Sequence, residues 1–275
     1  MSLLSSARQG SQRALPTRWL AESSPSRIRL TIALIYLALI TVAELVTTFA
    51  EPRVGLILHG GLLVILLIHS ALAAAEPYHR LLLGLVLAPL IRMLSLCLPL
   101  LDFPLLYWYL IISVPLGLAT LLAARALGFS REQLGLTARK MPLQLLVALT
   151  GITFGMAEYF ILRPDSLIDS PSLRNLLISS IILLICTGFA EEFIFRGVIQ
   201  RASIQALGRF GLLYTAILFA VLHIGYGSAL DVGFVFVVAI VFGLIAESTW
   251  SLLGVTLAHG LTNIVLFVVM PFLIT

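Results

Sequence analysis

The stretch NLLISSIILLICTGFAEEFIFRGVIQ, residues 175–200, places three ionisable side chains in a run of mostly apolar residues. They are Glu191, Glu192 and Arg196. A run of about 20 mostly apolar residues is long enough to cross a bilayer as a helix. Ionisable side chains are costly inside a membrane, and those found there commonly serve a function. The stretch therefore predicts a membrane-spanning helix that carries part of a polar functional site.

The composition of the whole chain also indicates a membrane protein. Of the 275 residues, 60% are hydrophobic and 11% are charged, whereas soluble chains average about 25% charged residues. The net charge is +4, and 16 of the 17 basic residues are arginines. Most of these lie between apolar runs, and no basic stripe is interleaved with aromatic residues. We interpret them as topology signals and contacts to lipid headgroups, and we expect no nucleic acid partner.

Nine segments are apolar and long enough to be candidate membrane spans, or eight if one of the shorter runs is re-entrant. They are residues 28–49, 54–75, 81–101, 105–124, 142–162, 175–200, 209–225, 231–249 and 251–273. Membrane-embedded open sheets are excluded because lipid cannot satisfy the backbone groups of a sheet edge. The predicted fold class is all-α, a polytopic membrane bundle of about eight or nine helices.

The distribution of basic residues between the spans predicts a cytoplasmic N-terminus, since positive residues favour the cytoplasmic side. In that orientation the cytoplasmic segments hold the arginines of residues 1–27 and eight further basic residues, and three lie outside. The eight are Arg29, Arg80, Arg125, Arg131, Arg139, Lys140, Arg201 and Arg209, and the three are Arg53, Arg163 and Arg174. We expect residues 1–27 to form a cytoplasmic tail and residues 28–124 to form the N-terminal transmembrane helices.

Three of the spans bring one ionisable residue each to a similar depth. At about 1.5 Å per residue, Glu191, His223 and His259 lie roughly 12 to 20 Å from the cytoplasmic ends of their spans. Glu192 and Arg196 are four residues apart on one helix face, so we expect them to pair. Glu191 is turned by about 100° from its neighbour and is left free to act.

A carboxylate and a histidine around one pocket suit the activation of water. Together they could hold a water molecule and remove its proton while its oxygen attacks a carbonyl group. His259 and Asn263, also four residues apart, would present hydrogen-bonding side chains to the resulting oxyanion. The sequence contains neither a GxSxG nor an HExxH pattern, so neither of these two motifs supplies the chemistry.

Other ionisable residues inside the spans have roles that the sequence leaves open. Arg92 and Glu158 either pair across two spans or each line a cavity. Glu44 and Glu247 lie near predicted membrane boundaries, where water or headgroups would solvate them. His59 is expected to pack in the bundle or to contact headgroups.

Three motifs in separate spans resemble those of the CAAX protease and bacteriocin-processing family of intramembrane peptidases, which includes the type II CAAX prenyl endopeptidase. They are EExxxR at residues 191–196, FxxxH at residues 219–223 and HxxxN at residues 259–263, in that order. The resemblance covers about residues 125–270. We therefore interpret residues 125–275 as the catalytic transmembrane core.

The resemblance implies a role for each motif residue. Glu191 would be the general base, and His223 would help to hold the attacking water. His259 and Asn263 would form the oxyanion site, supported by the neighbouring ion pair. It also implies a peptide or protein substrate in the membrane, with prenylated CAAX-type proteins and bacteriocin-related peptides as candidates, cleaved near the cytoplasmic face.

The resemblance leaves the cofactor open, because it admits both a metalloprotease and a metal-free glutamate mechanism. Two histidines and a glutamate are common zinc ligands, and Glu191, His223 and His259 would be those ligands. A non-catalytic scaffold or a proton-linked transporter would also place buried glutamate and histidine in its core. A transporter is expected to have discontinuous helices in paired halves, and the sequence shows no internal repeat.

Overall fold

The computed structural model describes residues 25–97 and 104–274, which form helices and no strands. Within these ranges eight helices are long and apolar enough to cross a membrane. They are α1 (Arg27–Phe49), α2 (Pro52–Leu72), α3 with α4 (His79–Cys97), α5 (Leu105–Ala126), α6 (Met141–Leu162), α7 to α9 (Leu173–Leu207), α11 (Ala229–Thr249) and α12 with α13 (Leu253–Leu273). The prediction of an all-α polytopic membrane bundle is confirmed, and the chain is an integral, multi-pass membrane protein.

Several spans are interrupted. The third consists of α3 (His79–Leu85) and α4 (Leu87–Cys97). The sixth runs through α7 (Leu173–Leu183), η3 (Leu184–Phe189), α8 (Ala190–Glu192), η4 (Phe193–Ile199) and α9 (Gln200–Leu207). The last runs through α12 (Leu253–Ile264), η6 (Val265–Val269) and α13 (Met270–Leu273). The predicted span at residues 209–225 is not among these eight. It is the shorter α10 (Phe210–Val221), followed by the 3-10 turn η5 (Ile224–Tyr226). Most of the predicted cytoplasmic tail, residues 1–24, lies outside the described residues.

Serine residues are the N-caps of three of the spans. Ser26, Ser172 and Ser228 each accept a hydrogen bond from the backbone N–H three residues later. Such caps satisfy backbone donors that the helix itself leaves unpaired. They fix where α1, α7 and α11 begin.

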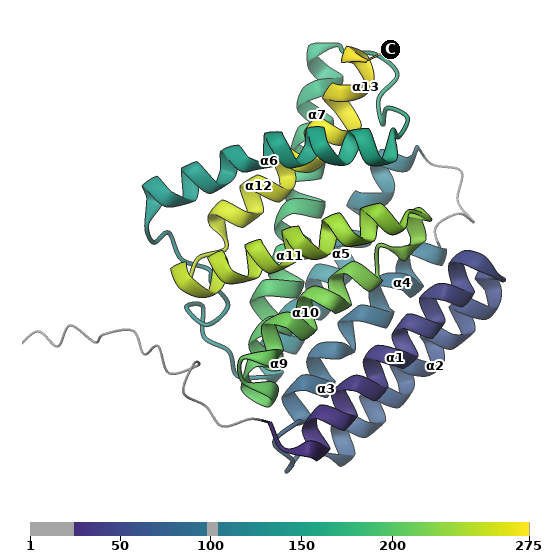
Figure 1. Cartoon of the computed structure of the whole chain (residues 1–275), viewed down its shortest axis with the longest axis vertical. Helices are drawn as coiled ribbons and strands as arrows, with labels where there is room; N and C mark the ends of the chain where they lie inside the picture. Colours follow the sequence, from purple (N-terminus) through teal and green to yellow (C-terminus); the bar gives the residue numbers. More distant parts are fainter. Residues whose placement is uncertain (1–24, 98–103, 275) are drawn as a thin grey trace, which may run out of the picture.

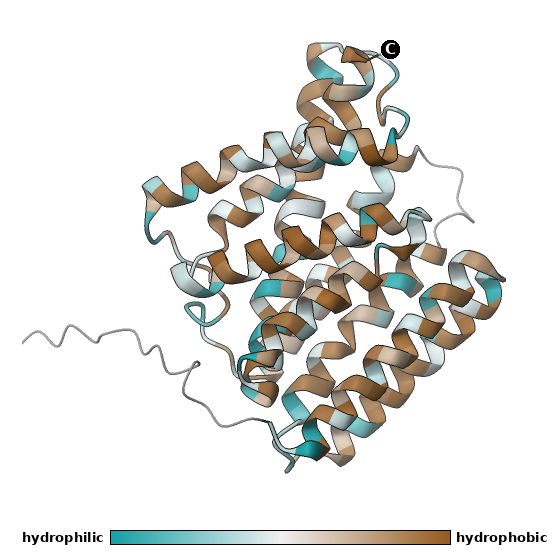
Figure 2. Ribbon diagram, in the orientation of Figure 1, coloured by the Kyte–Doolittle hydropathy of each residue, from teal (hydrophilic) through white to brown (hydrophobic). Residues whose placement is uncertain are grey.

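The outward faces of the helices are hydrophobic, while hydrophilic residues gather at helix ends, in loops and at points inside the bundle (Figure 2). Large apolar side chains such as Leu34, Ile57 and Leu146 are exposed on these faces. Exposed apolar surface on this scale is unusual for a soluble monomer. It is the surface that lipid tails would cover.

Glycines let α12 approach two neighbouring spans closely. A Cβ atom added to Gly151 on α6 would clash with the backbone of Ala258, and one added to Gly188 on η3 would lie 2.8 Å from the backbone N of Gly260. Small residues at helix contacts are a common packing device in membranes. They hold α12 between α6 and the span of α7 to α9 (Figure 1).

We expect Gly151→Ala to lower the stability of the bundle, because the new methyl group meets backbone rather than a side chain that could move. The cost should be about 1–3 kcal/mol, which is typical of an overpacked contact. Thermal unfolding of the purified protein in detergent measures it. Gly117→Ala on α5 is the matched control, since no heavy atom lies within 4 Å of its added Cβ. Equal melting temperatures for the two variants would contradict this packing.

The predicted orientation can be tested from two loops at opposite ends of the bundle. In a background without Cys97 and Cys186, an impermeant maleimide applied to intact cells should label Ser170→Cys and leave Ser130→Cys unlabelled until the membrane is permeabilised. The reason is the excess of arginine at the end that contains Ser130. The opposite labelling pattern would place the N-terminus outside.

Candidate active site

Glu191 and Glu192 lie on α8, a single turn between the π-helical segments η3 and η4. Short π-helical segments are rare and frequently occur at functional sites. They alter which residues share a helix face, so the two adjacent carboxylates enter different environments. The side chain of Glu192 is fully buried, whereas that of Glu191 is 31% exposed.

Glu192 is held by two cationic or hydrogen-bonding partners. Arg196 Nη1 donates to Glu192 Oε1 at 3.0 Å, and His259 Nδ1 lies 2.8 Å from the same oxygen. The Arg196 guanidinium also lies 4.5 Å from the centroid of the Phe219 ring. The predicted pairing of Glu192 with Arg196 is confirmed. The contact with His259 was not expected, and it joins α8 to α12.

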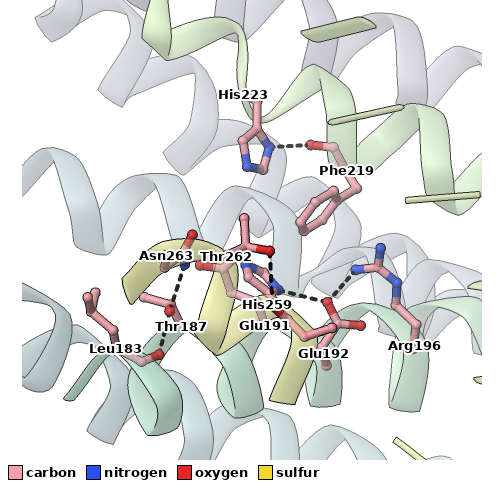
Figure 3. A network of polar contacts seen from close by, with 11 residues as sticks. Leu183, Thr187, Glu191, Glu192, Arg196, Phe219, His223, His259, Thr262 and Asn263 are labelled. Atoms are coloured by element: carbon pink, nitrogen blue, oxygen red, sulfur yellow. Dashed lines mark hydrogen bonds and ion pairs between the residues drawn. The ribbon is translucent and has the colours of Figure 1, made fainter. Parts of the chain in front are cut away.

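His259 lies between the two carboxylates of α8 (Figure 3). An ionised carboxylate only accepts hydrogen bonds, so His259 Nδ1 donates to Glu192. The other ring nitrogen, Nε2, is 3.8 Å from Glu191 Oε2. The imidazole is therefore fixed by the buried carboxylate and presented to the exposed one.

His223 has its tautomer set by the backbone. Its Nδ1 lies 2.8 Å from the carbonyl oxygen of Phe219, four residues earlier. Because a carbonyl oxygen can only accept, Nδ1 carries the hydrogen, and Nε2 of the neutral ring is an acceptor. Phe219 lies beside both histidines, with ring centroids 4.7 Å from His223 and 6.2 Å from His259.

Asn263 is anchored to the span that carries the two glutamates. Its Nδ2 donates to Thr187 Oγ1 at 2.8 Å, and the Thr187 hydroxyl donates to the carbonyl of Leu183. The amide has a second hydrogen that this bond does not use. Asn263 and His259 lie one turn apart on α12, as the spacing predicted.

All three motifs line one pocket of about 60 Å³, which we call the motif pocket (Figure 3). Its walls include the six side chains Glu191, Glu192, Phe219, His223, His259 and Asn263. The similar depth predicted for Glu191, His223 and His259 thus brings them to the same space. Arg196 does not line the pocket, but it is hydrogen-bonded to Glu192, which does.

Three further residues also line the motif pocket. Tyr226 stacks against His223 with a centroid distance of 5.9 Å, and its place one turn after that histidine could have indicated the contact. Tyr109, on α5, lies far from the motifs in the sequence, and no local pattern indicated its place. Glu158, on α6, lines the pocket as well, which agrees with one of the two alternatives left open for it.

Four other expectations for ionisable residues can be compared with the structure. Arg92 does not pair with Glu158: its Nη2 lies 2.6 Å from Oε2 of Glu44. The solvated role expected for Glu44 is wrong, because its side chain is fully buried, and His59 beside it is buried in the bundle as expected. Glu247 is also not solvated, since it is 6% exposed and pairs with Arg201 at 2.8 Å. Helix-to-helix ion pairs cannot be read from spacing along one helix.

The predicted metal ligands do not form a metal-binding set in this arrangement. Within residues 25–97 and 104–274, no group of three or more histidine, cysteine, aspartate or glutamate side chains is placed to hold a metal ion. In both histidines Nδ1 is hydrogen-bonded, to Glu192 and to a backbone carbonyl, and Nε2 is the ring nitrogen left for a ligand, an arrangement that metal-ligating histidines also have. Zinc binding by Glu191, His223 and His259 therefore stays a prediction, and no step below uses a metal.

The motif pocket lies in one half of the bundle. Its lining residues Glu158, Phe234 and Phe267 come from the last part of α6, the first part of α11 and the last span beyond α12. The loops rich in arginine, between α5 and α6 and between α9 and α10, lie at the other end (Figure 1). The pocket is thus nearer the end of the bundle that carries few basic residues.

Comparison with known families agrees with this geometry. Residues 173–265 match the family model described as type II CAAX prenyl endopeptidase Rce1-like, which is a protease family. The match includes every motif residue, and it is shorter than the resemblance found in the sequence. No curated protein and no solved structure matches the chain. Over residues 173–265 the chain is therefore similar to the Rce1-like type II CAAX prenyl endopeptidase family.

Proposed function

We propose that this protein is an intramembrane endopeptidase that hydrolyses a peptide bond with a water molecule activated by Glu191. The observation that supports the proposal is the difference in burial and hydrogen bonding between two adjacent carboxylates. Glu192 is fully buried and bonded to Arg196 and His259, whereas Glu191 is partly exposed in the motif pocket. One carboxylate is structural, and the other is free to exchange a proton.

In the proposed reaction Glu191 takes a proton from water as the water oxygen bonds to the carbonyl carbon of the substrate. His223 Nε2, an acceptor in the neutral ring, holds the second hydrogen of that water. The carbonyl oxygen becomes an oxyanion, for which Asn263 has an unused amide hydrogen and a protonated His259 would offer Nε2–H. Glu191 then returns the proton to the amide nitrogen as the C–N bond breaks, which yields a carboxylic acid and an amine. The acid then loses its proton to water and becomes a carboxylate.

The substrate class follows from the membrane location and the domain family. A peptide or protein segment that enters the bundle is the expected substrate, with prenylated CAAX-type proteins and bacteriocin-related peptides as candidates. The sequence led us to expect cleavage near the cytoplasmic face. A cytoplasmic N-terminus places the motif pocket in the other half of the bundle, so these two expectations do not fit together, and the labelling experiment above decides between them.

A non-catalytic scaffold or a proton-linked transporter is the alternative that uses the same buried glutamate and histidine. Both alternatives could keep the network of Glu192, Arg196 and His259. A scaffold does not need a second, partly exposed carboxylate beside a histidine, and a transporter is expected to have discontinuous helices in paired halves, whereas the sequence shows no internal repeat. For that reason the endopeptidase is the function that the geometry supports best.

We expect Glu191→Gln to lower kcat/KM for peptide cleavage by at least about 100-fold, because an amide cannot accept the proton from water. The assay uses purified protein in detergent and a panel of fluorogenic peptides with and without a prenylated cysteine. Glu132→Gln makes the same chemical change at an exposed loop residue paired with Arg139, and it should cleave at the wild-type rate. Equal activity in Glu191→Gln and wild type would overturn the mechanism. Melting temperatures of all variants show whether the fold survives.

A further inference from the structure

Arg92 forms a buried charged cluster that lies outside the family match. It is on α4, and its Nη2 lies 2.6 Å from Glu44 Oε2 on α1. Nε2 of His59, on α2, lies 3.3 Å from the other oxygen of the same carboxylate. The side chains of Glu44 and His59 are fully buried, while that of Arg92 is 16% exposed. The guanidinium is the one part of the cluster that reaches open space.

That open space is connected to the site. A second cavity, of about 220 Å³, is lined by Arg92 together with Glu191, His223 and Tyr226. A third, of about 570 Å³, is lined by Arg92, Tyr226 and residues at the ends of α1 and α4. Tyr109 and Tyr226 line these two cavities and the motif pocket alike. Arg92 thus lines the same cavity as Glu191, and it also lines a third cavity that shares Tyr226 with the second.

The cavities carry charges of both signs. In the second cavity the charged lining residues are Glu191 and Arg92. Among the described residues that line the third cavity, Arg92 is the charged one. Arg92 Nε is buried and has no hydrogen-bond partner in the described part of the chain, and Nη2 contacts Glu44. The remaining guanidinium nitrogen, Nη1, is therefore the donor for a carboxylate in the cavity, through a charge-assisted hydrogen bond.

The backbone of η5 lies close to the Arg92 guanidinium. A Cβ added to Gly225, within η5, would lie 3.0 Å from Arg92 Nη2. The glycine therefore leaves room for the guanidinium beside the turn that carries Tyr226. Glu44 contacts the same nitrogen, so the guanidinium lies between α1 and η5 rather than extending into lipid.

We propose that Arg92 is a substrate-positioning residue that binds a carboxylate of the peptide whose bond is cleaved at Glu191. The carboxylate is either the C-terminus of the peptide or an aspartate or glutamate side chain close to the cleaved bond. Glu44 and His59 orient the guanidinium and do not touch the substrate. This inference rests on the proposed peptidase function, since it assigns a subsite in the cavities that adjoin the same catalytic groups.

An ion pair that only ties α1 to α4 is the simpler reading of the same contact. Such a pair would stabilise the bundle without affecting which peptides are cleaved. The two readings differ in one measurable property, the dependence of cleavage on a carboxylate in the substrate. Stability alone cannot separate them, because removing one member of a buried pair destabilises the protein in either case.

The test compares three fluorogenic peptides that share one core sequence. The first has a free C-terminal carboxylate, the second a C-terminal amide, and the third a C-terminal amide with a glutamate as its last residue. Wild type should cleave the first or the third about 10- to 100-fold more efficiently than the second, as expected for charge-assisted hydrogen bonds. Whichever acid is preferred identifies the source of the carboxylate.

In Arg92→Gln this preference should disappear, so that the ratio of kcat/KM for the acid peptide to that for the amide peptide falls to about one. Glu44→Gln combined with Arg92→Gln replaces the pair by two neutral amides, and it should lose the preference in the same way without leaving a buried charge. Arg163→Gln, an exposed arginine that lines none of the three cavities, should keep it. An unchanged preference in both Arg92 variants would overturn the proposal.

Binding to the Glu191→Gln protein provides a readout that does not depend on turnover. Fluorescence anisotropy of the labelled acid and amide peptides should show tighter binding of the acid, and adding Arg92→Gln should remove the difference. If wild type cleaves no peptide, the proposed peptidase function fails, and this binding difference still decides the subsite. Equal binding of the acid and amide peptides would overturn the role of Arg92 even in an active protease.

Discussion

The buried carboxylate of Glu192 is the constraint on which the site depends. A charge in the apolar interior is tolerated only when it is paired and hydrogen-bonded. Arg196 on the same span and His259 on α12 provide those bonds, so the polar core is formed as the two spans pack. The contact places His259 beside Glu191, and it orients the imidazole. One buried carboxylate thus positions the groups around its partly exposed neighbour, the proposed base.

The packing of α12 makes this contact possible. Gly151 and Gly188 allow α12 to lie against two spans at backbone distance, and His259 can then reach across to α8. The π-helical segments on both sides of α8 turn Glu191 and Glu192 to different surroundings. Glycine packing and a local change of helical period therefore act on the same few residues, and both are needed for the geometry of the site.

Much of the architecture could be predicted from the sequence, because apolar length and arginine distribution follow from the properties of the bilayer. The pairing of Glu192 with Arg196 was predictable because both residues lie on one helix. The ion pairs of Arg92 with Glu44 and of Arg201 with Glu247 join residues far apart in the chain, and no local pattern specifies such partners. The π-helical segments could not be predicted either, because the depths and faces expected from the sequence assume the period of a regular helix.

The first four spans contribute more to the cavities than their place outside the matched domain suggests. Arg92 on α4 and Tyr109 on α5 line the space that adjoins Glu191. The motif residues and part of the cavity wall beside them thus come from different parts of the chain.

The central claim is that the Glu191 carboxylate activates water directly. The most direct test is the cleavage rate of protein from which metal ions have been stripped with a strong chelator and removed by desalting, with the metal content measured by mass spectrometry. The account predicts the same rate before and after stripping, at a metal content far below one ion per chain. Loss of cleavage on stripping, with recovery when zinc is restored, would contradict it.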